Sequence, residues 1–150
     1  MSVVIGIDPD SNKNGIAIYR NGVLIELLNL NSIQFYKWIV ENEKQSLKNN
    51  TIIIHMENPK GNNSSAFNHN KSLTQGAKNK ISERVGMVKQ AQTSIEQVAG
   101  ELGIQVVLHR VSSQWKKGRN KVLFEKVTNW KGRSNEDTRS AAWFGYLGIK

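Results

Sequence analysis

The most restrictive feature of this 150-residue chain is a short apolar run near its start that ends on an acid. Apart from Gly6, the residues from Val3 to Ile7 are all β-branched and apolar, which is typical of a strand buried inside a sheet. Asp8 follows directly, and the turn-forming residues PDSN come next. Because ligands gather at the carboxyl ends of strands in mixed and parallel sheets, Asp8 is the first candidate catalytic residue.

The remaining pattern predicts an α/β fold. The dipeptide Asn21-Gly22 predicts a tight hairpin between strands at 15–19 and 23–28. Hydrophobic periodicity predicts further strands at 51–56 and 104–108, and helices over about 32–47, 80–102, 121–130 and 136–147. We therefore expect a single domain over residues 1–150, with a mixed five-stranded sheet (three antiparallel strands, then two parallel ones) flanked by helices.

Composition excludes several classes of protein. The chain has no cysteine, which excludes disulfides and thiolate metal sites. No apolar stretch approaches the ~18 residues of a membrane span, and the N-terminus lacks the basic region of a signal peptide. We expect a cytoplasmic protein that contacts no membrane.

The net charge of +9 is unevenly distributed along the chain. Residues 1–57 carry five basic and six acidic groups, whereas residues 58–89 carry six basic and one acidic, and residues 109–133 carry eight basic and one acidic. Two separate basic blocks are typical of a surface that follows a phosphate backbone, although a merely solvated basic surface has the same composition.

The predicted nucleic-acid contacts lie in these two blocks. The first block includes a polar loop from Asn58 to Asn79, whose length favours a functional role. Phe67 is its only aromatic residue and could stack on a base or anchor the loop to the core, while His69 is a weaker candidate base. The candidate DNA-binding residues are Lys60, Phe67, Lys71, Lys78, Lys80, Arg84, Lys116, Lys117, Arg119 and Lys121.

Further acids are predicted at the same sheet edge as Asp8. Glu57 ends the fourth predicted strand, and the pair Glu136-Asp137 begins the last predicted helix. If the first and fourth strands are parallel neighbours, these carboxylates converge, and oxygen-only ligands suit Mg²⁺ or Mn²⁺. Two such ions could drive phosphodiester hydrolysis. Each acid also has an ordinary structural explanation as a turn residue, a strand-end charge or a helix-dipole partner, and we interpret Asp10 as a turn residue.

Three segments resemble the RuvC-like Holliday junction resolvases of the RNase H-like superfamily. IGIDPDSNKNGIAI resembles their first motif, IIIHMENP is similar to the second, and NEDTRSAAWFGYLG is similar to the last. The segment SSQWKK resembles the Trp-Lys stretch of small viral and phage members. The resemblance covers nearly the whole chain in order and spacing.

The resemblance implies an RNase H-like fold, a homodimer, Mg²⁺ dependence without a small-molecule cofactor, and paired nicks across a four-way DNA junction. It assigns metal binding to Asp8, Glu57 and Asp137, with Glu136 as a secondary catalytic acid. One departure is that Ser140 occupies the position of another metal-binding Asp. Two alternatives stay open. One is a ribonuclease H or a flap and branch nuclease of broader specificity, because fold alone does not separate these substrates. The other is a catalytically weakened nucleic-acid-binding module, which Ser140 favours.

Overall fold

The computed structural model describes residues 2–61 and 74–150, and its centre is one five-stranded sheet in the order β3-β2-β1-β4-β5. The strands are β1 (Val3–Asp8), β2 (Asn14–Arg20), β3 (Val23–Leu30), β4 (Ile52–Glu57) and β5 (Gln105–His109). β1 pairs antiparallel with β2 and β2 antiparallel with β3, whereas β1 pairs parallel with β4 and β4 parallel with β5. The predicted mixed sheet is confirmed.

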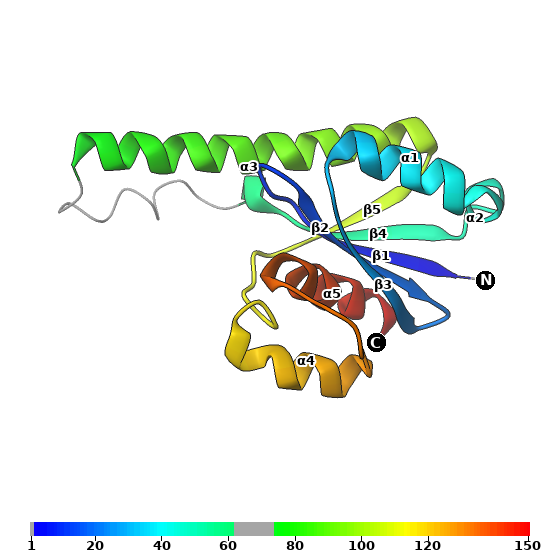
Figure 1. Ribbon diagram of the computed structural model, residues 1–150. Coiled ribbons are helices and arrows are strands. Elements are labelled where there is room, and N and C mark those ends of the chain that lie inside the picture. Colours follow the sequence, from blue (N-terminus) through cyan, green and yellow to red (C-terminus); the bar gives the residue numbers. More distant parts are fainter. Residues whose placement is uncertain (1, 62–73) are drawn as a thin grey trace.

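Helices cover both faces of the sheet (Figure 1). One face carries α1 (Ser32–Asn42), α2 (Lys44–Lys48) and the long α3 (Gln75–Leu102), and the other carries α5 (Glu136–Ile149), with α4 (Lys121–Thr128) beyond it. Short 3-10 helices lie at Pro59–Gly61 (η1) and Gly118–Asn120 (η3). No helix within residues 2–61 and 74–150 is long and apolar enough to cross a membrane.

Alternating side chains on the central strands build two separate cores. Val3, Ile5 and Ile7 of β1 pack on the α1/α3 face, together with Phe35 and Ile95. The intervening β1 residues face α5, where Val4 packs against a second cluster that includes Tyr19 and Phe124. Because the side-chain period of a strand is two, Asp8 lies on the same face as Val4, under α5.

The hairpin prediction is also confirmed. Asn21 and Gly22 both have positive φ angles, +50° and +81°, as a two-residue turn between twisted antiparallel strands requires. Two helix boundaries differ from expectation. The helix expected over 32–47 breaks at Glu43, whose carboxylate is buried and accepts hydrogen bonds from Arg20, with Arg20 Nη1 3.0 Å from Oε2. The break thus coincides with an ion pair between the buried Glu43 and the partly exposed Arg20 of β2.

The other boundary difference concerns α3, which begins at Gln75 rather than near residue 80. Thr74 caps it by accepting a hydrogen bond from the backbone N–H of Ala77 at 3.1 Å. The polar segment expected to be a loop up to Asn79 is therefore partly helical. Its composition concealed the cap because the first α3 turns have little apolar surface.

Glycines let α5 approach the sheet closely. A Cβ added to Gly6 would collide with the backbone of Ala141 and Gly145, and one added to Gly15 would collide with the backbone of Asp137. These contacts are backbone to backbone, so no side-chain rotation can relieve them. The absence of side chains at two strand positions therefore fixes where the first turn of α5 lies.

We expect Gly15→Ala to destabilise the protein by roughly 1–3 kcal/mol, the usual cost of overpacking, because α5 must move away from the sheet. Gly86→Ala is the matched control. Nothing lies within 4 Å of the Cβ that it would add inside α3, so it should stabilise by about 0.5–1 kcal/mol. Urea denaturation measures both changes, and a Gly15→Ala variant as stable as the parent would contradict the close approach of α5.

Candidate active site

Two buried acids end adjacent parallel strands. Ile7 of β1 is paired with Met56 of β4, so the following residues, Asp8 and Glu57, lie at the same edge of the sheet. Ile52, Ile54 and Met56 point into the α1/α3 core, which places the alternating residue Glu57 on the α5 face with Asp8. The exposed fraction is 2% for Asp8 and 8% for Glu57. Both carboxyl groups have thus been removed from bulk water.

A third acid comes from the first turn of α5. Asn135 caps this helix by accepting a hydrogen bond from the backbone N–H of Thr138 at 2.9 Å. Close packing on Gly15 sets the helix start against the β1–β2 edge, and Asp137 is half-buried there. Its carboxyl group is hydrogen-bonded to Asp10. Three acids from three separate elements therefore converge.

The segment after β5 places a lysine among these acids. Lys116 Nζ lies 3.4 Å from Asp8 Oδ2 and 3.9 Å from Asp137 Oδ1. The same segment donates the backbone N–H of Ser112 to Glu57 Oε1 at 3.4 Å. We call Asp8, Glu57, Asp137 and Lys116 the acid cluster.

Burial and mutual repulsion change how the acid cluster binds protons. Burial, together with the hydrogen bond and negative charge of Asp8, raises the pKa of Glu57 to about 9. Burial, the hydrogen bond that the protonated Asp137 carboxyl donates to Asp10, and the charge of Asp8 raise the pKa of Asp137 to about 6. Burial acts to lower the pKa of Lys116, but the surrounding carboxylates outweigh it and raise that pKa. The acids therefore favour an added cation or proton.

The donor set fits a hard divalent cation in its chemistry. Asp8, Glu57 and Asp137 offer only carboxylate oxygens, the ligands that Mg²⁺ and Mn²⁺ prefer. Burial beside other carboxylates raises the pKa values of Glu57 and Asp137, and a bound cation would offset that effect. As arranged here, however, no three His, Asp or Glu side chains within residues 2–61 and 74–150 form a metal-binding group. Metal binding would thus require side-chain adjustment around Lys116.

Of the two acids in the segment NEDTRSAAWFGYLG, only Asp137 belongs to the acid cluster. Glu136 is exposed, and it is not among the groups that shift the pKa of Asp137 or Lys116. Ser140 is fully buried, and its hydroxyl has no hydrogen-bond partner in the described part of the chain. Asp10 accepts a hydrogen bond from the backbone N–H of Ser11 at 2.7 Å, as expected of a turn residue, but it also contacts Asp137.

The predicted DNA-binding residues fall into separate groups. Lys78, Lys80 and Arg84 lie along the first turns of α3. Lys60 forms an ion pair with Glu96, 2.6 Å from Nζ to Oε1. Lys117, Arg119 and Lys121 are exposed around η3, close in sequence to Lys116 of the acid cluster. Phe67, His69 and Lys71 lie outside the described residues.

A histidine pair is a feature that sequence reasoning missed. His55 Nδ1 and His109 Nε2 are 2.8 Å apart, and their rings stack with centroids 5.1 Å apart. Burial lowers the pKa of both rings. The histidine pair follows from the parallel pairing of β4 with β5. This pairing aligns Glu57 with His109 and so brings the two histidines onto one face of the sheet.

An aromatic cluster lies on the outer side of α5. The ring centroid of Trp115 is 5.6 Å from Phe124, 5.3 Å from Trp143 and 5.2 Å from Tyr146. Trp143 and Tyr146 thus pack within this chain, as does the buried Phe144. These side chains therefore take part in the packing of this chain's own core.

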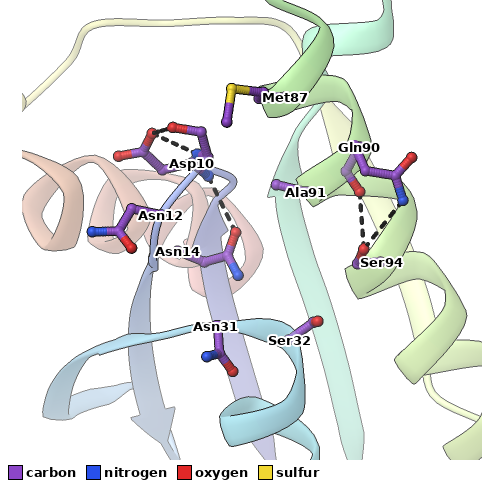
Figure 2. A pocket seen from close by; sticks show the side chains of 10 residues that line it. Asp10, Asn12, Asn14, Asn31, Ser32, Met87, Gln90, Ala91 and Ser94 are labelled. Carbon is purple, nitrogen blue, oxygen red and sulfur yellow. Dashed lines mark hydrogen bonds between the residues drawn. The ribbon is translucent and has the colours of Figure 1, made fainter. Parts of the chain in front are cut away.

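A polar groove of about 250 Å³ adjoins the acid cluster on the other side of Asp10. Figure 2 shows it between the β1–β2 loop, the start of α1, and Met87, Ala91 and Ser94 of α3. The residues that line it are Asp10, Ser11, Asn12, Asn14, Asn31, Ser32, Met87, Gln90, Ala91 and Ser94. They include one carboxylate and no cation, so this groove does not form part of the basic surface.

The raised pKa of Glu57 predicts how stability depends on pH. Between about 4.5 and about 9 the folded protein holds a proton that the unfolded chain releases, so stability should fall as pH rises through this range. Glu57→Gln mimics the protonated form and should flatten this dependence, giving roughly 1–3 kcal/mol more stability than the parent at pH 8.

Thermal unfolding in chelator at pH 5 and pH 8 measures this effect. Glu136→Gln is the control, because the exposed Glu136 side chain should leave the pH dependence unchanged. An equal pH dependence in the parent and in Glu57→Gln would show that the Glu57 carboxyl is not held protonated.

Comparison with known proteins identifies the fold. No protein-family model matches the chain, and no curated protein sequence matches it. Among solved structures, Thermus thermophilus RuvC in complex with a Holliday junction substrate matches 99% of this chain and 94% of its own, with a TM-score of 0.54 and 14% identity. A second T. thermophilus RuvC structure matches 98% of this chain and 97% of its own at 14% identity, with a TM-score of 0.49.

At this identity the likeness concerns the backbone, and it extends over almost the whole of both chains. A mixed five-stranded sheet flanked by helices was expected from the sequence, and the structure adds the strand order β3-β2-β1-β4-β5. The chain has an RNase H-like fold of the RuvC type.

Proposed function

We propose that residues 1–150 form a single metal-dependent endonuclease domain that cuts branched DNA, with four-way junctions as its preferred substrate. The observation that supports it is the acid cluster: buried Asp8 and Glu57 meet Asp137 and Lys116 at one sheet edge. A fold of the RuvC type adds support, because the RuvC structure that matches this chain was determined with a Holliday junction substrate. Fold alone does not fix substrate, so the proposal rests on the site.

Asp8, Glu57 and Asp137 would bind Mg²⁺, or Mn²⁺ in its place. We propose two ions per active site, the number that suits phosphodiester hydrolysis. When bound, such ions activate a water and stabilise the leaving oxygen of a phosphodiester. The side chains themselves supply a buried, negatively charged edge. Exposed Glu136 is at most a secondary contributor.

Lys116 is the cluster residue best suited to the substrate. Its raised pKa keeps the ammonium charged near neutral pH, and its half-buried position limits competition from water. We propose that it meets an oxygen of the cleaved phosphate, while Lys117, Arg119 and Lys121 hold the flanking backbone. A second arm of the DNA would contact Lys78, Lys80 and Arg84 of α3, together with Lys60. We propose that Phe67 and Lys71 contact this second arm as well.

We propose a homodimer, because two symmetric cuts require two symmetric active sites. The first half of α3 extends past the sheet in Figure 1. It presents the partly exposed Ile81, Val85 and Val88, which recur at i, i+4 and i+7 and so form an apolar stripe suited to a second copy. We propose that the dimer acts in the cytoplasm.

Metal-dependent cleavage is the direct test. A labelled four-way junction, a Y-fork and an RNA–DNA hybrid are each incubated with Mg²⁺ or Mn²⁺. We expect symmetric cleavage of the junction and a loss of at least about 10³-fold in Asp8→Asn, because removing one member of a metal-binding set disables the site. Glu136→Gln is the matched control and should retain most activity.

The outcomes separate the alternatives. Preferential cleavage of the hybrid or of the Y-fork would favour a ribonuclease H or a flap nuclease. Junction binding without metal-dependent cleavage of any substrate would favour a binding module and overturn the enzyme proposal. The buried, unpaired hydroxyl of Ser140 is the observation that favours that last outcome.

Junction affinity should fall steeply with added salt if phosphate contacts dominate binding. We expect log Kd to vary linearly with log salt concentration, and Arg119→Ala to reduce the slope by about 1. Lys48→Ala, at the end of α2 and far along the chain from both basic blocks, should leave the slope unchanged. Fluorescence anisotropy measures these slopes, and a flat salt response in the parent would contradict the proposed basic surface.

A further inference from the structure

An arginine beside the acid cluster is buried without a carboxylate partner. Arg139 of α5 is only 5% exposed. Across residues 2–61 and 74–150, no acid forms an ion pair with its guanidinium group. A buried charge is costly unless it is well hydrogen-bonded, so the partners of Arg139 must compensate for its desolvation.

Those partners are mainly two successive backbone carbonyls. Arg139 Nε donates to the carbonyl oxygen of Trp115 at 3.0 Å, and Nη2 donates to that of Lys116 at 2.9 Å. Nη1 donates to Ser134 Oγ at 3.2 Å. The planar guanidinium fork is suited to holding two neighbouring acceptors at once, which a lysine cannot do. Arg139 therefore holds the two peptide groups that flank Lys116, one joining it to Trp115 and the other joining it to Lys117.

The residue before Lys116 has an unfavourable backbone conformation. Trp115 has a φ angle of +62°, in the left-handed region that bulky residues rarely adopt. Its ring is 2% exposed and is packed among Phe124, Trp143 and Tyr146. Such strain persists only where the surroundings hold the residue from several directions. Here the aromatic cluster holds the ring, and Arg139 holds the carbonyl.

The strained backbone at Trp115 sets the position of the next residue, Lys116. Lys116 is a long side chain on an irregular segment, yet its ammonium lies 3.4 Å from Asp8 and 3.9 Å from Asp137. Lys117, one residue further, is exposed and has no contact with these acids in the described structure. Lys116 reaches the acids and Lys117 does not, and the backbone that Arg139 holds is the one on either side of Lys116.

We propose that Arg139 is a positioning residue that, with the strained Trp115, holds the 115–116 backbone so that the Lys116 ammonium stays in the acid cluster. This inference rests on the proposed function for its consequence in catalysis. Arg139 itself contacts neither the acids nor the proposed phosphate site. Its effect on cleavage should therefore pass entirely through Lys116.

A double-mutant cycle tests this route. Single-turnover cleavage of a four-way junction with saturating protein and Mg²⁺ is measured for Arg139→Met, Lys116→Met and the double variant. We expect Arg139→Met to lower the rate about 10- to 100-fold with little change in junction Kd. In the Lys116→Met background the same substitution should lower it by less than about threefold. Equal losses in both backgrounds would show a merely structural role and overturn the inference.

Ser134→Ala is the matched control, because it removes the third hydrogen bond of Arg139 and leaves both carbonyl contacts intact. Its cleavage rate should stay within about twofold of the parent. Arg139→Lys retains the buried charge but can hold one carbonyl only, so its rate should lie between those of the parent and Arg139→Met. This variant also serves if Arg139→Met does not fold, as checked by circular dichroism.

Chemical labelling tests the positioning without relying on cleavage. Brief acetylation of the folded protein, followed by mass spectrometry, gives the reactivity of Lys116 relative to that of its neighbour Lys117. We expect Lys116 to react at least about fivefold more slowly in the parent, because it is half-buried among carboxylates, and within about twofold in Arg139→Lys. An unchanged ratio would overturn the inference. A parent that labels as expected but cleaves nothing would overturn the proposed function instead.

Discussion

Two carboxylic acids buried side by side impose the main physical constraint on this protein. The parallel pairing of β1 with β4 places Asp8 and Glu57 at the ends of adjacent strands, on the face that α5 covers. Two ionised carboxylates cannot remain together in such a place without a proton or a cation. The pKa of Glu57, about 9, reflects that conflict. Lys116, on the segment after β5, brings positive charge to this edge.

Strand β2, helix α5 and the segment after β5 meet at these two acids. Gly15 lets the start of α5 approach the sheet and so delivers Asp137. The segment after β5 returns over the same edge and delivers Lys116. Arg139, also from α5, binds the backbone of that segment, so one helix supplies an acid and also fixes the lysine that partly neutralises the acids. The stability of the cluster and its proposed chemistry thus depend on the same helix position.

The charge distribution around the acid cluster also bears on the proposed binding of nucleic acid. Lys116 neutralises the acids only in part, and the exposed Lys117, Arg119 and Lys121, which follow it closely in the chain, add positive surface charge. A phosphate backbone drawn to that surface would bring a phosphodiester to the acids. The groove beyond Asp10 has no cation among its lining residues, so it adds no positive charge to this surface.

Local sequence alone determined the strands, the Asn21-Gly22 turn and the acids at strand ends, because these depend on residue type and on periods of two and about 3.6 along the chain. Only the tertiary structure decided which acids meet. Glu136 and Asp137 are neighbours in sequence, yet the orientation of α5 over Gly15 brings one to the cluster and leaves the other exposed. The roles of Trp115, Lys116 and Arg139, and the pairing of His55 with His109, depend on contacts between residues distant in sequence. A local pattern of residue types cannot predict such contacts, because long-range packing sets them and local propensity does not.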